Sequence, residues 1–146
     1  MGSLTLPASG RVYVDTQVIV YAVEKHPEFS ATLRLLWQSV QAGALVAVSS
    51  ELVVHEVLVL PLRNKDTALV DAYEGFVQQP GFELQPITRG VLRDAAVLRS
   101  RLQRLRTPDA IHAATAIAQQ CQILLTNDRG LRGIDQLDVC VLSDVL

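Results

Sequence analysis

Four acidic side chains stand at positions from which they can act together on one metal ion. Asp15 and Asp128 each come at or just after the end of a short apolar run, and Asp109 begins an alanine-rich segment. Glu56 lies within the apolar stretch LVVHEVLVL. If the four carboxylates converge, each pair at about 4 Å costs on the order of 4 kcal/mol at an effective dielectric of ~20. They can therefore all stay ionised only around a cation.

The donor atoms predict which cation this is. Carboxylate oxygens without histidine or cysteine ligands favour a hard cation, Mg²⁺ or Mn²⁺. Such an ion lowers the pKa of bound water and neutralises charge on a phosphoryl oxygen. The predicted chemistry is metal-assisted hydrolysis of a phosphodiester.

Glu56 is the most informative of the four acids. On a helix its neighbours three and four positions away are Leu52, Val53, Val59 and Leu60. A carboxylate on an apolar face either reaches solvent or is buried with a partner, because an unpaired buried charge is costly. The other three acids also have simpler explanations: Asp15 and Asp128 as turn formers or helix caps, Asp109 as an acid favoured by the helix dipole.

Strands and helices alternate in the predicted secondary structure. We expect strands over 11–15, 44–48, 82–87, 122–126 and 139–142. A helix should follow the first strand, with further helices over 29–42, from Ser49 or Ser50 to Pro61, from Asn64 to Pro80, over 88–105 and from the cap Thr107 onward. This order predicts an α/β fold with a mostly parallel sheet that is covered on both faces. Ligands of such folds bind beyond the carboxyl ends of the strands.

Length and composition are those of one globular domain. The chain has 146 residues, 49% of them apolar, and a formal net charge of -2. We expect residues 1–10 to be a lead-in segment of this single domain. No apolar run is long enough to cross a membrane, and no signal peptide is recognisable. Two separate cysteines, Cys121 and Cys140, favour a reducing, cytoplasmic compartment over a disulfide framework.

Four motifs in this order resemble the PIN-domain ribonucleases, most closely the VapC-type toxins of toxin–antitoxin pairs. The motifs are VYVDTQVIVYAVE, SSELVVHEV, TPDAIHAATA and ILLTNDRGL, and the resemblance extends from Arg11 to about Leu142. It implies a three-layer α/β/α sandwich and a metal-dependent endoribonuclease that cuts RNA. It also implies a homodimer neutralised by an antitoxin, whose peptide segment covers the active-site groove.

The family's acidic quartet falls on Asp15, Glu56, Asp109 and Asp128. From this we expect Asp15 and Asp109 to contact Mg²⁺ or Mn²⁺ directly, and Glu56 and Asp128 to complete the site directly or through water. The resemblance also assigns accompanying polar positions to Thr16, Ser49 and Thr126. Gln17 departs from the family, which commonly has Asn there, and this puts the metal affinity in question rather than the fold.

Arginines are concentrated around two of the four acids. Seven of the 11 arginines lie between Arg93 and Arg132, so the net charge averages an acidic pocket with basic surroundings. Arg129 and Arg132 follow Asp128 directly and are the preferred phosphate contacts. The arginines from Arg93 to Arg106 form either a solvated helix face or a phosphate track. His112 is interpreted as a packing or supporting residue of the site rather than a ligand.

Three alternative functions compete with this one. A phosphatase with a strand-end nucleophile requires a second carboxylate two residues after Asp15, where this chain has Gln17. A phosphoacceptor domain requires a strand-end lysine, which neither Lys25 nor Lys65 provides. The remaining alternative is a catalytically weak or inactive PIN fold that serves as a binding or scaffold protein.

Overall fold

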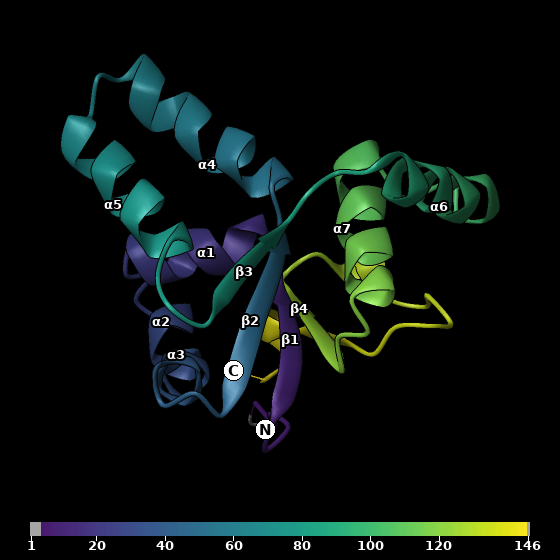
Figure 1. The fold of residues 1–146 in the computed structure, drawn as a ribbon, viewed down its shortest axis with the longest axis horizontal. Coiled ribbons are helices and arrows are strands. Elements are labelled where there is room, and N and C mark those ends of the chain that lie inside the picture. Colours follow the sequence, from purple (N-terminus) through teal and green to yellow (C-terminus); the bar gives the residue numbers. More distant parts are fainter. Residues whose placement is uncertain (1–3, 146) are drawn as a thin grey trace.

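Five short strands form one sheet at the centre of the computed structural model, which describes residues 4–145 (Figure 1). Their spatial order is β3-β2-β1-β4-β5, and every neighbouring pair is parallel. The strands are β1 (Gly10–Val14), β2 (Leu45–Ser50), β3 (Phe82–Gln85), β4 (Ile123–Thr126) and β5 (Val139–Val141). The predicted α/β class with helices on both faces is confirmed, and the mostly parallel sheet is in fact entirely parallel.

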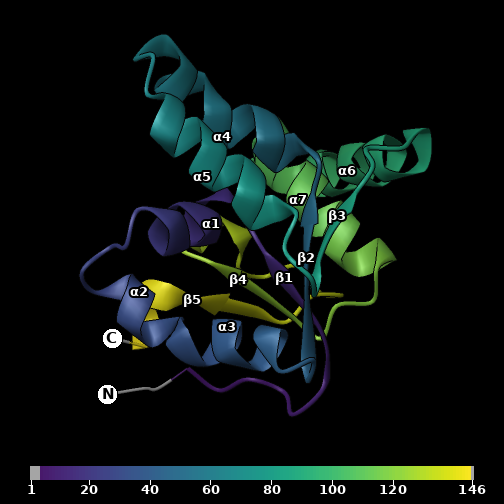
Figure 2. The same cartoon turned by 60° about the vertical axis from the view of Figure 1, so that its left-hand side comes forward.

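Helices cover both faces of this sheet, as Figures 1 and 2 show from two directions. One layer contains α1 (Thr16–Val23), α2 (Phe29–Thr32), α3 (Arg34–Gln41), α4 (Leu52–Arg63) and α5 (Thr67–Val77). The other contains α6 (Arg89–Arg101) and α7 (Thr107–Ala118). Two short 3-10 turns, Arg129–Leu131 and Leu142–Val145, follow β4 and β5.

The alternation of side chains along β1 divides the core into two parts. Val12 and Val14 pack with Ile19 of α1 and Leu36 of α3, whereas Tyr13 points to the opposite face. There Tyr13 packs with alanines of α7, whose small side chains let the helix approach the sheet closely. This close approach brings the N-terminus of α7 to the carboxyl ends of the strands.

Several predicted element boundaries are wrong, and local hydrogen bonds explain why. The strand predicted over 44–48 runs on to Ser50, so Ser49 belongs to β2, and α4 begins after Glu51. The next helix begins after Asp66 rather than at Asn64, because the Asp66 carboxylate caps the amide of Leu69. Helix α4 continues through Pro61 to Arg63, although the proline has no N–H to donate to the carbonyl one turn earlier.

The first half of the chain also holds a break that periodicity did not reveal. The helix predicted over 29–42 is interrupted at Leu33, which separates α2 from α3. In the second half α6 ends at Arg101 rather than at residue 105. Thr107 lies inside α7 instead of capping it, and its hydroxyl accepts a hydrogen bond from Arg99. Within residues 4–145, no helix combines the length and the apolar character that a membrane span requires.

Candidate active site

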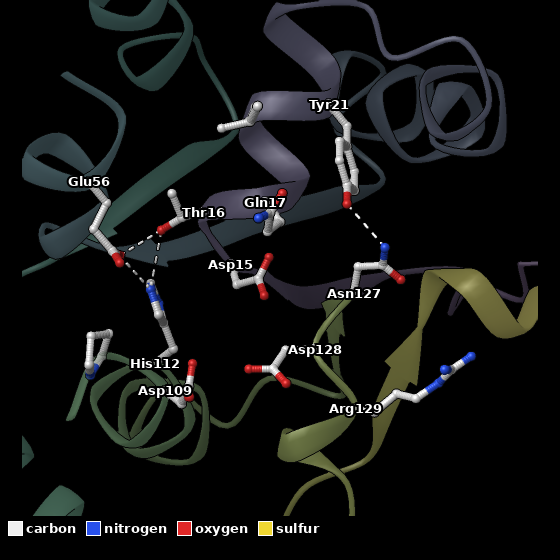
Figure 3. Close-up of a pocket in the computed structure, with 12 residues that line it drawn as sticks. Asp15, Thr16, Gln17, Tyr21, Glu56, Asp109, His112, Asn127, Asp128 and Arg129 are labelled. Carbon is white, nitrogen blue, oxygen red and sulfur yellow. Dashed lines mark hydrogen bonds and ion pairs between the residues drawn. The ribbon is translucent and has the colours of Figure 1, made fainter. Parts of the chain in front are cut away.

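A pocket of about 700 Å³ lies at the carboxyl ends of β1 and β4, next to the N-terminus of α7 (Figure 3). β1 is the central strand of the sheet. It pairs with β2 on one side and with β4 on the other. A crevice forms at such a switch point because the adjoining connections leave in opposite directions. All four predicted acids line this pocket: Asp15, Glu56, Asp109 and Asp128.

Asp15 is the most deeply held of the acids, with 6% of its surface exposed. It directly follows β1 and caps α1, where its Oδ1 accepts a hydrogen bond from the Val18 amide at 3.2 Å. Its Oδ2 accepts a hydrogen bond from the hydroxyl of Thr126. Burial raises the pKa of the Asp15 carboxyl above its ordinary value, although the Thr126 hydrogen bond opposes this. The side chain is thus fixed in place, and its burial disfavours the charged carboxylate.

Asp109 and Asp128 face the pocket from α7 and from the turn after β4. Asp128 is exposed, and its Oδ1 accepts a hydrogen bond from the Gly130 amide at 2.8 Å. Burial raises the pKa of the Asp109 carboxyl, and the negative charge of Asp128 raises it further. The repulsion between carboxylates expected from the sequence is therefore present in the structure.

Glu56 differs from the aspartates in having two donors of its own. Its Oε1 accepts hydrogen bonds from the Thr16 hydroxyl at 2.7 Å and from Nε2 of His112 at 3.0 Å. Burial alone would raise the pKa of the Glu56 carboxyl, but these hydrogen bonds bring it below its ordinary value. The partner required for a carboxylate on an apolar helix face is thus His112 together with Thr16.

Of the other predicted site residues, some line the pocket and others lie outside it. Thr16, Gln17 and Arg129 line the pocket. Thr126 lies beneath it, where its hydroxyl binds Asp15 and accepts a hydrogen bond from the Asp128 amide at 2.9 Å. Ser49 does not reach the pocket, because its buried hydroxyl donates to the carbonyl oxygen of Val14 at 2.6 Å.

Arg132 does not line the pocket either, because its guanidinium pairs with Asp144. Two of the arginines expected in a solvated face or phosphate track instead hold loops near the site. Arg99 donates to the carbonyl of Leu105, and Arg104 donates to the carbonyls of Gly130 and Arg132.

Two polar residues that sequence reasoning did not assign to the site, Tyr21 and Asn127, also line the pocket, as does His112, which was expected to support the site. The amide of Asn127 donates to the Tyr21 hydroxyl at 3.1 Å, which links α1 to the end of β4. Asn127 could have been found by the argument that found Asp128, since both follow the same strand. Tyr21 lies one helical turn after Gln17, which places both on the same face of α1.

The donor set fits a hard divalent cation, since every predicted ligand is a carboxylate. Burial raises the pKa of Asp15 and of Asp109, so a cation bound beside them would favour their charged forms. Across residues 4–145, however, no three histidine, cysteine or acidic side chains form a ready-made metal cage. The four acids nevertheless share one pocket.

Comparison with known proteins places the chain among PIN domains. The PIN domain family model matches residues 12–137. No curated protein sequence matches the chain significantly.

Solved structures with the same fold include toxin–antitoxin proteins. A chain of VapBC2 from Rickettsia felis, bound to a DNA fragment from its promoter, has a TM-score of 0.73 at 20% identity over 89% of this chain and 97% of its own. A toxin–antitoxin complex from Klebsiella pneumoniae gives 0.64 at 20% identity, with 88% and 95% covered. Mycobacterium tuberculosis VapC20, described as a sarcin-ricin loop cleaving toxin, gives 0.64 at 17% identity, with 77% and 86% covered.

Proposed function

This chain belongs to the PIN domain family, and on that premise we propose that it is a metal-dependent endoribonuclease, the toxin of a toxin–antitoxin pair. The observation that carries the proposal is the gathering of Asp15, Glu56, Asp109 and Asp128 from four separate elements around one pocket. The similarity of the fold to VapBC2 and to VapC20 supports the same conclusion.

The aspartates and Glu56 would hold Mg²⁺ or Mn²⁺ in this pocket, as the oxygen donors of a hard cation. When bound, the ion would neutralise the carboxylates and supply Lewis-acid activation of the scissile phosphodiester. Asp15 is preset for this role, because the Val18 amide and the Thr126 hydroxyl fix both of its oxygens.

The other lining residues would bind and orient the RNA. Arg129 is a cation at the pocket rim; its guanidinium lies 3.6 Å from Asp144 and would exchange this exposed ion pair for two oxygens of one phosphate. Gln17 is exposed at the start of α1 and offers an amide that both donates and accepts hydrogen bonds. The Asn127 side chain is held by Tyr21 and by the Ser143 amide, so this wall of the pocket is rigid.

The decisive experiment is cleavage of structured and single-stranded RNA with Mg²⁺ or Mn²⁺, comparing the wild type with Asp15→Asn. Asp71→Asn is the matched control, because Asp71 is exposed on α5 and does not line the pocket. We expect Asp71→Asn to cut like the wild type, and both to stop cutting in EDTA. Equal activity of Asp15→Asn and the wild type, or cleavage that survives EDTA, would refute the mechanism.

The proposal also includes protein partners: a second copy of the chain and an antitoxin whose peptide segment covers the pocket. Exposed apolar side chains support a protein-binding surface, among them Leu60 and Leu62 on α4 and Leu35 on α3. Helices α4 and α5 project together beyond the sheet (Figure 2). Light scattering tests the dimer directly. If the wild type cuts no RNA yet binds a peptide partner tightly, the protein is a PIN-fold scaffold instead.

A further inference from the structure

A chain of buried hydrogen bonds leads from the core of the protein to Glu56 (Figure 3 shows its pocket end). The hydroxyl of Tyr13, in β1, lies 2.6 Å from Nδ1 of His112 in α7. Nε2 of the same imidazole lies 3.0 Å from Oε1 of Glu56 in α4. The Thr16 hydroxyl, in α1, donates to that oxygen as well. Residues of three helices and of the central strand thus belong to one hydrogen-bond network.

The directions of these hydrogen bonds follow from the surroundings of Tyr13. Tyr13 is fully buried with its hydroxyl 2.6 Å from Nδ1, and a phenol, whose ordinary pKa is about 10, carries its proton at neutral pH. A phenol that donates to Nδ1 leaves the proton of the neutral imidazole on Nε2, since the hydrogen bond at one ring nitrogen sets the tautomer at the other. The Nε2–H group then donates to the Glu56 carboxylate.

Both donors bind the same oxygen of Glu56. Thr16 and His112 each contact Oε1, and among the hydrogen bonds of residues 4–145 none involves Oε2. His112 is itself 4% exposed and edge-on to Tyr13, with ring centroids 5.7 Å apart, so the imidazole cannot turn freely. The arrangement fixes one carboxylate oxygen and leaves the other available to the pocket.

We propose that Tyr13 and His112 are positioning residues for Glu56: the Tyr13 hydroxyl fixes the tautomer and orientation of His112, whose Nε2–H group aims the Glu56 carboxylate into the pocket. This inference rests on the proposed function, because it assigns Glu56 a ligand-holding role. Both ring nitrogens of His112 already have partners, which fits a supporting residue rather than a ligand.

The tautomer is tested without reference to activity. In long-range proton–nitrogen correlation spectra at neutral pH, the wild-type His112 should show a protonated Nε2 and an unprotonated Nδ1. In Tyr13→Phe the Nδ1 signal should move, because it loses its donor, while Nε2 stays protonated. Tyr73→Phe is the matched control, since Tyr73 is a buried tyrosine that donates to Glu24 away from the pocket. A protonated Nδ1 in the wild type would overturn the proposal.

The role of His112 toward Glu56 is tested by Mn²⁺ binding, measured by electron paramagnetic resonance without RNA. We expect His112→Ala and Tyr13→Phe to raise the half-saturating Mn²⁺ concentration on the order of tenfold, as losses of supporting hydrogen bonds do at metal sites. His112→Gln carries an N–H donor on a side chain of similar reach and should recover much of this loss. Thermal unfolding checks that each variant is folded.

In RNA cleavage the same variants should lower kcat and leave the KM for RNA unchanged, because Glu56 is displaced while the RNA contacts remain. If His112→Gln binds Mn²⁺ as weakly as His112→Ala, the imidazole is only a packing residue and the proposal fails. The proposed function and the roles of Tyr13 and His112 are tested by different measurements. A wild type that cuts no RNA refutes the proposed function, whereas the NMR and Mn²⁺ results decide the roles of Tyr13 and His112.

Discussion

Glu56 and Asp15 are carboxylates of one pocket, yet their surroundings shift their pKa values in opposite directions. Glu56 is half-buried and receives hydrogen bonds from His112 and Thr16, which lower the pKa of its carboxyl. Asp15 is more deeply buried, and its hydrogen bonds do not offset the cost of burying its charge. Two acids that appear equivalent in a motif are therefore different in their electrostatics.

On one side of the pocket the protein itself stabilises the charged form of a carboxylate, that of Glu56. On the other side burial of Asp15 prevails over its hydrogen bonds. Around Glu56 the donors come from α1 and α7. Around Asp15 and Asp109 burial raises both pKa values and the carboxylate of Asp128 adds to this, while the opposing effect of His112 does not outweigh it. A cation bound beside Asp15 and Asp109 would therefore stabilise their charged forms more than one bound beside Glu56 would stabilise that carboxylate. The following predictions test this contrast.

The largest expected effect is on RNA cleavage by Asp109→Asn. Because the aspartate side depends on the ion, removing one of its charges should lower the cleavage rate on the order of a hundredfold or more, equivalent to several kcal/mol of lost stabilisation. Single-turnover cleavage with saturating Mn²⁺ measures it, with Asp71→Asn as the control. Near-normal cleavage by Asp109→Asn would mean that this side of the pocket does not hold the ion.

The next effect is stabilisation of the folded protein by metal. A ligand at a hundred times its Kd stabilises the native state by about 2.7 kcal/mol. We expect Mn²⁺ to raise the Tm of the wild type by several degrees and that of Asp15→Asn hardly at all. Differential scanning fluorimetry with and without EDTA tests this. An equal rise in both proteins would show that the ion binds elsewhere.

The pH dependence of metal-free stability should differ between the two acids. The folded-state pKa of Asp15 lies above its ordinary value of 3.8, so the folded state holds that proton more tightly. Its contribution to stability is therefore lost as pH rises from 3.8 through the raised value. Above that window Asp15→Asn should stabilise the metal-free protein by more than about 0.5 kcal/mol, beyond what surface substitutions usually do. Below 3.8 the two proteins should converge.

Chemical denaturation in EDTA over a pH series measures this difference. If Asp15→Asn is less stable than the wild type at neutral pH, the burial of Asp15 is compensated within the protein, and the contrast with Glu56 fails.

An effect of similar size but opposite sign is expected from Glu56→Gln. The folded-state pKa of Glu56 is lowered, so its charge contributes stability above the ordinary value of 4.5, and this is lost as pH falls through the lowered one. At neutral pH Glu56→Gln should destabilise the metal-free protein by about 1 kcal/mol, the scale of a charge-assisted hydrogen bond that becomes neutral. The change in the free energy of unfolding should have the opposite sign to that of Asp15→Asn in the same denaturation experiment.

Sequence reasoning placed the four acids in the right region because strand ends and an apolar helix face are local signals. Asp15 and Asp128 follow strands whose parallel pairing brings their ends to one edge. Glu56 stands out among apolar neighbours, and the structure gives it the partner that its position demanded. The α/β class, likewise, follows from the alternation of strands and helices along the chain.

What the sequence did not reveal depends on contacts between distant segments. Nothing near Tyr13 in the chain indicates that its hydroxyl meets His112, 99 positions away. Ser49 was expected beside the acids, but its place in β2 turns its hydroxyl to the carbonyl of Val14. The pairing of Arg132 with Asp144 equally joins segments whose distance is set by the fold and not by local sequence.

The hydrogen bond between Thr126 and Asp15 joins residues 111 positions apart in the chain. A nascent chain that has not yet released β4 from the ribosome lacks Thr126 and Asp128, as well as the strand that borders one side of β1. Because domains fold as units, the pocket can assemble only after the chain has been made through β4 and the turn that follows it. Synthesis itself thus delays any activity of this site until the segment that carries Asp128 has left the ribosome.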